Sequence, residues 1–248
     1  MERIRKPLQG VTNIVRFNWH FYAIAALASA LLFMLSGYIS SPYYYYINMA
    51  AVLMITVVLS SLLISAYIYD WSGLYTFQWL NKAEIKLAGH TVNINAGFDE
   101  TSHLLQAKYP HAQISVFDFY DPEKHTEISI KRARKKYPAY PGTLSINTSF
   151  VPLVSASADQ ILITFAAHEI RNHEERIFFF RELKRILKPG GKIIVTEHLR
   201  DIPNFVAYTI GFFHFLRKSA WYSTFRASAL NVDREIKHTP FVTIFVLS

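Results

Sequence analysis

The hydrophobic positions of this chain follow two different patterns. From Phe17 to Tyr69 there is no Asp, Glu, Lys or Arg. Within this segment, two apolar stretches, 20–39 and 47–69, each have the length of about 20 residues that a helix needs to cross the hydrocarbon layer. From residue 86 onward, short apolar runs alternate with amphipathic stretches, which is typical of βα units around a parallel sheet. The pattern therefore predicts a membrane part followed by a globular part.

The two apolar stretches are predicted to form a transmembrane hairpin with a tight turn. Ser40-Ser41-Pro42 breaks the helix, and the four tyrosines at 43–46 suit the headgroup boundary. The basic residues lie only on the outer flanks, at Arg3, Arg5, Lys6 and Arg16 before the pair and at Lys82 and Lys86 after it. The positive-inside rule then predicts an integral membrane protein whose two termini and catalytic part are cytoplasmic.

Two other interpretations of the apolar part are weaker. A signal peptide shares the basic start, but Gly37-Tyr38-Ile39-Ser40 is a poor cleavage site and a second apolar stretch follows almost at once. A buried hairpin of a soluble protein would need polar positions at helical spacing, which this stretch lacks. Residues 4–17 mix basic and apolar side chains, so we expect a short amphipathic helix on the inner leaflet.

The globular part is predicted to be an α/β domain. Its expected strands are 92–94, 113–118, 143–146, 160–165 and 192–197; its expected helices are 101–108, one that runs on through 131–136, and 174–187; and 233–238 with 241–247 form a terminal hairpin. Lys188-Pro189-Gly190-Gly191 ends the last helix, with glycine as its C-cap. The expected division is a membrane anchor with a connecting helix at 1–82 and the globular domain at 83–248.

Composition narrows the possible chemistry. The chain has no cysteine, which excludes disulfides, cysteine zinc ligands and a cysteine nucleophile. The formal net charge is +8, and the basic run at 131–136 is its densest cluster. We interpret this run as a solvated helix face, with attraction to anionic lipid headgroups as the second possibility. Nucleic acid is the weakest candidate partner, and no nucleic-acid binding is expected.

A resemblance to a known family rests on three segments. Leu183 to Val195, with LKPGG leading into a strand, resembles a signature of class I S-adenosylmethionine-dependent methyltransferases. Val116-Phe117-Asp118 resembles the second strand of that family, and the terminal hairpin resembles its antiparallel sixth and seventh strands. The resemblance covers about 83–248, and it is to type 11 and small-molecule O-methyltransferases. It implies a Rossmann-like seven-stranded domain that binds S-adenosyl-L-methionine, preceded here by two transmembrane α-helices.

The glycine loop departs from the family pattern. Where the family has an acid followed by G-x-G-x-G, this chain has Asn93, Asn95, Gly97 and Asp99. Asn tolerates positive φ better than other non-glycine residues, so Asn95 is expected to keep the turn. Asp99 would place a carboxylate near the cofactor's amino group or sulfonium. The stretch 95–101 also resembles the GAGxDxR loop of leucine carboxyl and polyketide O-methyltransferases, so Asn95, Gly97 and Asp99 are candidate cofactor residues.

The resemblance adds three further cofactor candidates. Asp118 ends the second strand, where the family's acid binds the cofactor ribose; the alternative is an N-cap of the next helix. Phe119 would lie against the adenine face, or would belong to the core. Asn147 follows the third strand, where the family reads the adenine amino group, and its alternative is a turn residue.

His168-Glu169, directly after the fourth strand, is the candidate catalytic pair. It resembles the His-Asp dipeptide of phenol O-methyltransferases, in which the imidazole takes the acceptor's proton. A phenol with a pKa of about 10 needs such a base. With Ile170-Arg171-Asn172 the segment also resembles quinone C-methyltransferases, and His168 packing under the cofactor without proton transfer is the structural alternative. No metal is expected, because the next histidine, His173, is not at HExxH spacing.

Two apolar segments suggest where a lipophilic acceptor would enter. Residues 203–216 have no charge and five aromatic side chains, which predicts either a buried helix or a lid that dips toward the bilayer. Trp71, Tyr75 and Trp79 repeat every four residues and are expected to line one helix face. Together these segments would form a portal.

The sequence thus predicts an integral-membrane S-adenosylmethionine-dependent methyltransferase. Its expected partners are the lipid bilayer and a hydrophobic membrane-resident small molecule, methylated at an aromatic hydroxyl. The main alternative is a catalytically inactive, membrane-tethered pseudo-methyltransferase that serves as a binding or assembly subunit. Methylation of protein carboxylates or side chains is a third possibility, suggested by Gly97-Phe98-Asp99. No oligomeric state is predicted.

Overall fold

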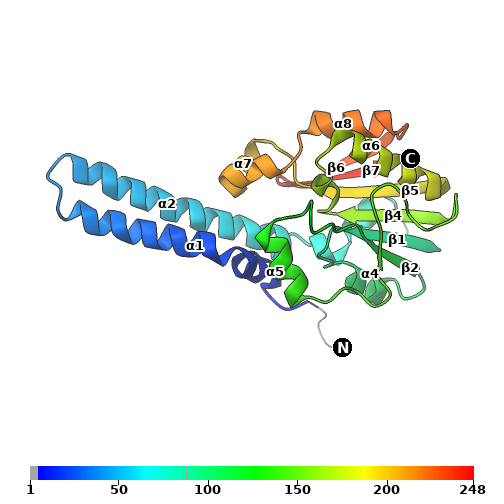
Figure 1. The fold of residues 1–248 in the computed structure, drawn as a ribbon, viewed down its shortest axis with the longest axis horizontal. Helices are drawn as coiled ribbons and strands as arrows, with labels where there is room; N and C mark the ends of the chain where they lie inside the picture. Colours follow the sequence, from blue (N-terminus) through cyan, green and yellow to red (C-terminus); the bar gives the residue numbers. More distant parts are fainter. Residues whose placement is uncertain (1–4, 86, 88) are drawn as a thin grey trace.

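The computed structural model describes residues 5–85, 87 and 89–248, so Arg3 and Lys86 of the orientation argument lie outside the described residues. A long helical hairpin projects from an α/β body (Figure 1). The hairpin consists of α1 (Gln9–Ser36) and α2 (Tyr43–Ala66), which pack side by side. The tyrosines expected in the turn form the first turn of α2.

Both helices of the hairpin are long and apolar enough to cross a membrane. The candidate spans are Gln9–Ser36 and Tyr43–Thr76, and only 6% of the most apolar window of each is buried. The side chains of Phe21 and Ile24 are each 62% exposed. A core helix of a soluble protein would have these faces covered, so the hairpin differs from such a helix.

α1 also contains residues 9–17 of the segment 4–17, which was expected to be a separate amphipathic helix. Asn18 has non-helical angles (φ −117°, ψ 19°), and this kink separates the first two turns from the apolar stretch. The kink frees the carbonyl of Phe17, which accepts a hydrogen bond from Arg132 of the body at 2.6 Å. The first part of α1 therefore packs on the body, where Asn13 accepts from the Tyr137 hydroxyl at 2.8 Å.

The helix after the second apolar stretch is broken into short pieces. A π-turn, η1 (Tyr67–Trp71), is followed by a 3₁₀ turn, η2 (Leu74–Thr76), and by α3 (Trp79–Lys82). Trp71 is exposed, whereas Trp79 is buried and donates its indole N–H to Leu74 O. The expectation that Trp71, Tyr75 and Trp79 line one helix face is wrong, because Gly73 (φ +78°) turns the chain between them. The division of the chain at residue 82 stays a prediction.

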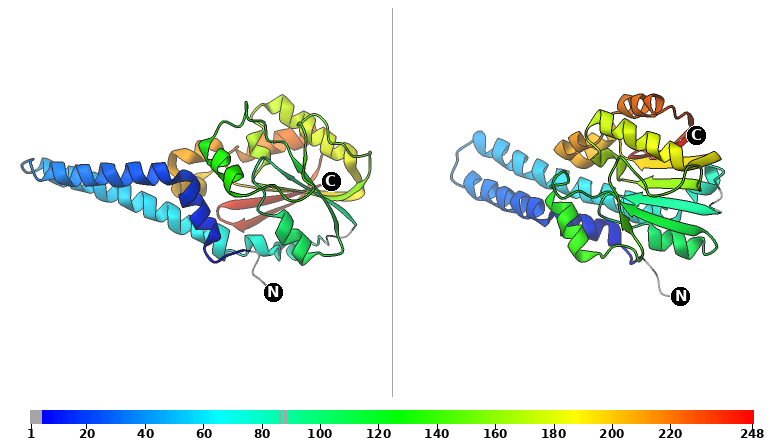
Figure 2. Two further views of the ribbon diagram at one scale, coloured as in Figure 1. Left: turned by 60° about the horizontal axis from the view of Figure 1, so that its bottom comes forward. Right: turned by 45° about the vertical axis from the view of Figure 1, so that its right-hand side comes forward.

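The body contains a seven-stranded sheet in the order β3-β2-β1-β4-β5-β7-β6 (Figures 1 and 2). The strands are β1 (His90–Asn95), β2 (Gln113–Asp118), β3 (Leu144–Ser145), β4 (Ala158–Thr164), β5 (Leu187–Glu197), β6 (Val232–Thr239) and β7 (Val242–Leu247). The first five are parallel, and β7 runs antiparallel to β5 and β6. The predicted Rossmann-like class and antiparallel terminal hairpin are confirmed.

Helices cover both faces of the sheet. The remaining helical elements are α4 (Ser102–Lys108), α5 (Ile128–Lys136), η3 (Ala167–Glu169), α6 (His173–Ile186), α7 (Ile202–Tyr208), η4 (Thr209–His214) and α8 (Lys218–Ala227). β4 alternates its side chains between the two faces: Ile161 and Ile163 pack with α6 and α8, whereas Leu162 packs with α3 and α4. One local prediction is wrong: Leu187, in extended conformation, is the C-cap of α6, and Gly190 (φ +81°) lies inside β5.

Candidate active site

The candidate residues gather where the parallel strands end. After β1, the chain forms β2 and β3 on one side of β1 and then crosses to form β4 on the other side. The strand order therefore reverses between β1 and β4. Ligands of doubly wound sheets bind outside the carboxyl ends of the strands at such a reversal. Asn95 ends β1, Asp118 ends β2, and His168 follows β4. The topology therefore brings together residues that are up to 73 positions apart in sequence.

The loop after β1 keeps a tight turn in a different way from the one predicted. Asn95 remains extended as the last residue of the strand, and its Oδ1 accepts the N–H of Gly97 at 3.1 Å. The positive φ, +97°, is at Gly97. The turn is thus made by a side-chain hydrogen bond of Asn95 and by the freedom of glycine.

Asp99 holds the turn before α4. Its Oδ1 accepts the backbone N–H groups of Thr101 and Ser102 at 2.8 and 2.9 Å, as an aspartate does in an Asx turn. Its other oxygen, Oδ2, is buried and makes no hydrogen bond among the described residues. A buried carboxylate oxygen without a partner is costly, and it marks a place for a donor such as an ammonium group.

Asp118 is buried and forms an ion pair across the loop. Its Oδ1 accepts the N–H of Tyr120 at 2.9 Å, and its Oδ2 lies 2.5 Å from Nη1 of Arg134. The alternative role as N-cap of the next helix is excluded, because α5 begins at Ile128 with Glu127 as its cap. The same Arg134 nitrogen donates to Gly97 O at 3.3 Å. Arg134 therefore bridges the two loops that were predicted to hold the cofactor.

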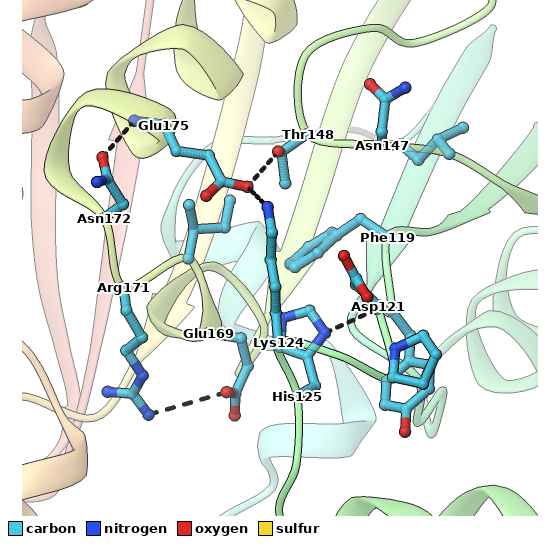
Figure 3. Close-up of a pocket in the computed structure, with 14 residues that line it drawn as sticks. Phe119, Asp121, Lys124, His125, Asn147, Thr148, Glu169, Arg171, Asn172 and Glu175 are labelled. Atoms are coloured by element: carbon cyan, nitrogen blue, oxygen red, sulfur yellow. Dashed lines mark hydrogen bonds and ion pairs between the residues drawn. The ribbon is translucent and has the colours of Figure 1, made fainter.

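Two cavities are lined by residues of the loops that follow the parallel strands. The larger, about 510 Å³, is lined by Phe119, Asn147, Glu169 and Arg171 among others, and Figure 3 shows these side chains around it. The smaller, about 90 Å³, is lined by Asn95, Thr101 and Glu169 among others. Glu169 thus borders both cavities. Phe119 also packs on Phe179 in the core, and Asn147 accepts from Ser149 N as a turn residue, so each retains its structural role beside the cavity.

His168 is held from one side by a buried carboxylate that the sequence analysis missed. Its Nδ1 lies 2.6 Å from Oε2 of Glu197, and its backbone N–H donates to Oε1 of the same residue at 3.1 Å. Glu197 ends β5 and is fully buried. The predicted partner, Glu169, lies on the other side of the ring, 3.4 Å from Nε2. The signal available in the sequence was an acid at the end of a predicted strand.

The carboxylates set the charge of the ring. Burial by itself lowers the pKa of His168, but Glu197 and Glu169 outweigh it and raise the pKa to about 10. Burial likewise raises the pKa of Glu169, while its hydrogen bonds with His168 and His214 hold it well below its usual range. The cluster is therefore built to hold positive charge.

η4 covers His168. The rings of His214 and Phe215 lie against His168 with centroid distances of 5.0 and 5.9 Å. His214 Nε2 lies 3.0 Å from Oε1 of Glu169. His168 lines neither cavity, so an acceptor reaches its ring only when this cover moves.

A second buried cluster joins the hairpin to the site. The hydroxyl of Tyr69, at the end of the second apolar helix, lies 2.8 Å from Nε2 of His198 and 3.1 Å from the hydroxyl of Tyr208 on α7. His198 Nδ1 contacts Phe241 O at 2.9 Å, and burial lowers the pKa of His198 to about 4. A neutral ring donates from Nδ1 and accepts at Nε2, so the cluster fixes the hairpin against the site.

Comparisons with known proteins agree with this architecture. Residues 103–195 match the family model described as a methyltransferase domain. No curated protein matches the chain in sequence. The chain is similar in structure to a SAM-dependent methyltransferase from Aquifex aeolicus, with 16% identity and a TM-score of 0.51 over 73% of this chain and 94% of that chain. The mitomycin 7-O-methyltransferase MmcR is also similar, with 16% identity and a TM-score of 0.52 over 98% of this chain and 73% of that chain.

The body thus has the fold of S-adenosylmethionine-dependent methyltransferases, and it contains the segment that matches a methyltransferase domain. Its residues fit that cofactor: Gly97 has positive φ, Asp118 ends β2, and Asp99 offers an unpaired oxygen. The fit requires one rearrangement. A Cβ at Gly97 would lie 2.8 Å from the Tyr120 ring and 3.1 Å from Arg134, so these two side chains now fill the space beside the glycine.

Proposed function

We propose that the protein methylates an aromatic hydroxyl of a hydrophobic, membrane-resident small molecule. The observation that carries the proposal is the His168–Glu197 pair, which lies at the strand ends together with Gly97 and Asp118. The cofactor, when bound, supplies a methyl group on a sulfonium. Asn95, Gly97, Asp99, Asp118, Phe119 and Asn147 would hold it.

His168 is placed to handle the acceptor's proton. Glu197 fixes its Nδ1 and leaves Nε2 on the side of Glu169, which borders both cavities. Because a pKa of about 10 keeps the resting ring protonated at neutral pH, the ring must first release a proton to solvent. A hydroxyl that then gives its proton to the neutral Nε2 becomes a phenolate beside an imidazolium. The carboxylates that raise the pKa of the ring stabilise this ion pair, and the phenolate is the better nucleophile. Glu197 acts as a positioning residue.

The surface above His168 supports a lipophilic acceptor. α7 packs beside α2, on the side of the body from which the hairpin projects (Figure 1). The outward side chains of α7 and η4 are apolar: Ile202 is 79% exposed and Ile210 is 81% exposed. Phe205, Val206 and Phe213 extend this exposed surface. Apolar side chains exposed beside a candidate span are expected to enter the headgroup layer, so η4 would contact lipid outside and His168 inside.

A catalytically inactive subunit is the second candidate function. It is favoured by one observation, the Arg134–Asp118 ion pair, which occupies the carboxylate that the cofactor ribose would need. Arg134 is 38% exposed, however, and an ion pair of this exposure contributes only about 1 kcal/mol or less. A bound cofactor can therefore displace it, and we favour the enzyme.

Membrane integration is tested by extraction. Native membranes that contain the protein are washed with alkaline carbonate and with concentrated salt. We expect the protein to stay in the pellet and to leave it only with detergent, because two inserted apolar helices are not released by screening of charge. A triple variant, Lys131→Gln, Lys135→Gln and Lys136→Gln, is the matched control: it removes basic charge from α5, and its retention should be unchanged.

Release into the aqueous wash would contradict the membrane part of the proposal. Recovery as a soluble dimer would show that the apolar faces of α1 and α2 are covered by a second copy of the chain instead. The orientation is tested separately by adding a protease to the outside of intact cells. We expect the body to stay uncut, since both termini are proposed to be cytoplasmic.

A further inference from the structure

Two histidines converge on one carboxylate beneath η4. His168 Nε2 lies 3.4 Å and His214 Nε2 lies 3.0 Å from the same atom, Oε1 of Glu169. One ligand atom from each of the three residues lies within 4.8 Å of the others. Donor atoms about 2.1 Å from a shared divalent ion are roughly 3.0 to 3.4 Å apart in octahedral or tetrahedral geometry. Two of the three separations already have this size, and the third needs the two rings to approach each other.

Each of these histidines has its other nitrogen on a further carboxylate. His168 Nδ1 lies 2.6 Å from Glu197, and His214 Nδ1 lies 2.8 Å from Glu127. Histidines that bind metal ions almost always donate their second N–H to a carboxylate, a carbonyl or water, which fixes the tautomer and the ring orientation. The pattern carboxylate–imidazole is present twice, and both imidazoles present Nε2 to Glu169.

We propose that His168, Glu169 and His214 bind one divalent transition-metal ion, with Glu197 and Glu127 as the outer carboxylates. Two imidazoles and one carboxylate form a facial donor set that leaves coordination positions open. Imidazole donors favour ions such as Zn²⁺ and Fe²⁺ over Mg²⁺ and Ca²⁺. The segments that supply the ligands, η3 and η4, are 40 residues apart in sequence and meet only in the fold.

The guanidinium of Arg171 competes with a metal ion for His214 and Glu169. It donates to His214 O, contacts both ring nitrogens of His214, and lies 3.8 Å from Oε2 of Glu169. Its side chain is 43% exposed, so it can move into solvent at small cost. Figure 3 shows Arg171 beside Glu169 among the side chains that line the larger cavity. Metal binding at the cluster therefore requires Arg171 to leave, and its removal should favour the ion.

Only the role of the ion in methyl transfer rests on the proposed function. A divalent ion lowers the pKa of an oxygen ligand, so an acceptor hydroxyl bound at an open position would ionise there and release its proton to solvent. The ion would then replace the His168 ring as the group that stabilises the phenolate. Binding of the ion itself needs neither the cofactor nor the acceptor.

The test is a titration of the full-length protein in detergent with Co²⁺, after a chelator has removed bound metal. We expect one Co²⁺ per chain, with the visible absorption of a nitrogen and oxygen site, and displacement of that absorption by Zn²⁺. Glu127→Gln should weaken binding about 10- to 100-fold, as loss of an outer carboxylate does. His214→Ala removes a ligand and should weaken binding further.

Two more variants make the result specific. Arg171→Gln should bind Co²⁺ more tightly than the unmodified protein, which a merely destabilised site would not do. His111→Ala, which removes an exposed histidine in the connection before β2, is the matched control and should bind as the unmodified protein does. Melting temperatures separate misfolding from loss of a ligand.

Absence of saturable Co²⁺ binding would overturn the metal site. Binding by His214→Ala and by Glu169→Gln that is as tight as in the unmodified protein would also overturn it. The outcome is distinguishable from failure of the proposed function. Methyl transfer that is insensitive to a chelator, in a protein that binds no Co²⁺, leaves the proposed function and rejects the ion. Stoichiometric Co²⁺ binding without methyl transfer would support the metal site and reject the proposed function.

Discussion

Replacing His168 with alanine lowers the rate of methyl transfer about 10²- to 10⁴-fold, the range that a positioned acid–base group contributes. The affinity for S-adenosylmethionine stays nearly unchanged, because the ring is assigned to the acceptor's proton and not to the cofactor. The measurement is single-turnover transfer of a labelled methyl group, together with a calorimetric titration of the cofactor. His111→Ala serves as the control.

Variants of the two glutamates separate positioning from catalysis. Glu197→Gln retains a side-chain oxygen that can accept from His168 Nδ1, so its loss of turnover should be smaller than that of His168→Ala, with KM for the cofactor unchanged. Glu169→Gln should also cost less than His168→Ala. Full activity in His168→Ala, with an unchanged melting temperature, would show that the histidine is structural.

Asp118→Ala weakens binding of S-adenosylmethionine by about 1.5 to 3 kcal/mol, the range for hydrogen bonds to a charged group, or roughly 10- to 100-fold in Kd. Arg134→Ala changes affinity in the opposite direction, because it removes the cation that now holds Asp118 and lies against Gly97. The gain should be at most about fivefold, since the pair is partly exposed. Calorimetry on both variants measures the two effects.

The opposite signs make this pair of variants informative. Weaker binding in both would mean that Arg134 holds the cofactor rather than competing with it. Unchanged binding in a folded Asp118→Ala protein would show that the ends of β1 and β2 are not used as proposed. No binding in any variant or in the unmodified chain would favour the inactive subunit.

Local pattern was sufficient for most of the fold. β2 was predicted at its observed bounds, Gln113–Asp118, because an apolar run ends there on an acid. α6 and the terminal hairpin also carry strong periodic signals, and their predicted positions differ from the observed ones by one or two residues. The break of the second apolar helix was missed, because a single glycine and a π-turn leave the four-residue spacing of the aromatic residues intact in sequence.

The sequence predicted those parts of the site whose residues are neighbours along the chain. His168 was found through its neighbour Glu169, but the carboxylate that holds its Nδ1 is Glu197, 29 residues away on β5. Arg134 was hidden in a basic run whose expected role was solvation, and the fold turns this one member toward Asp118. Both contacts depend on which strands are neighbours, and spacing along the chain carries no such information.

The most direct test of the central claim uses the protein in lipid nanodiscs with S-adenosylmethionine labelled on its methyl group and an extract of its native membranes. We expect the label to enter an organic-soluble product in an ether linkage that survives mild alkali, and we expect His168→Ala and Asp118→Ala both to suppress this transfer. Label recovered as an alkali-labile ester on protein, or no transfer although the cofactor binds, would contradict methylation of a lipophilic hydroxyl by this protein.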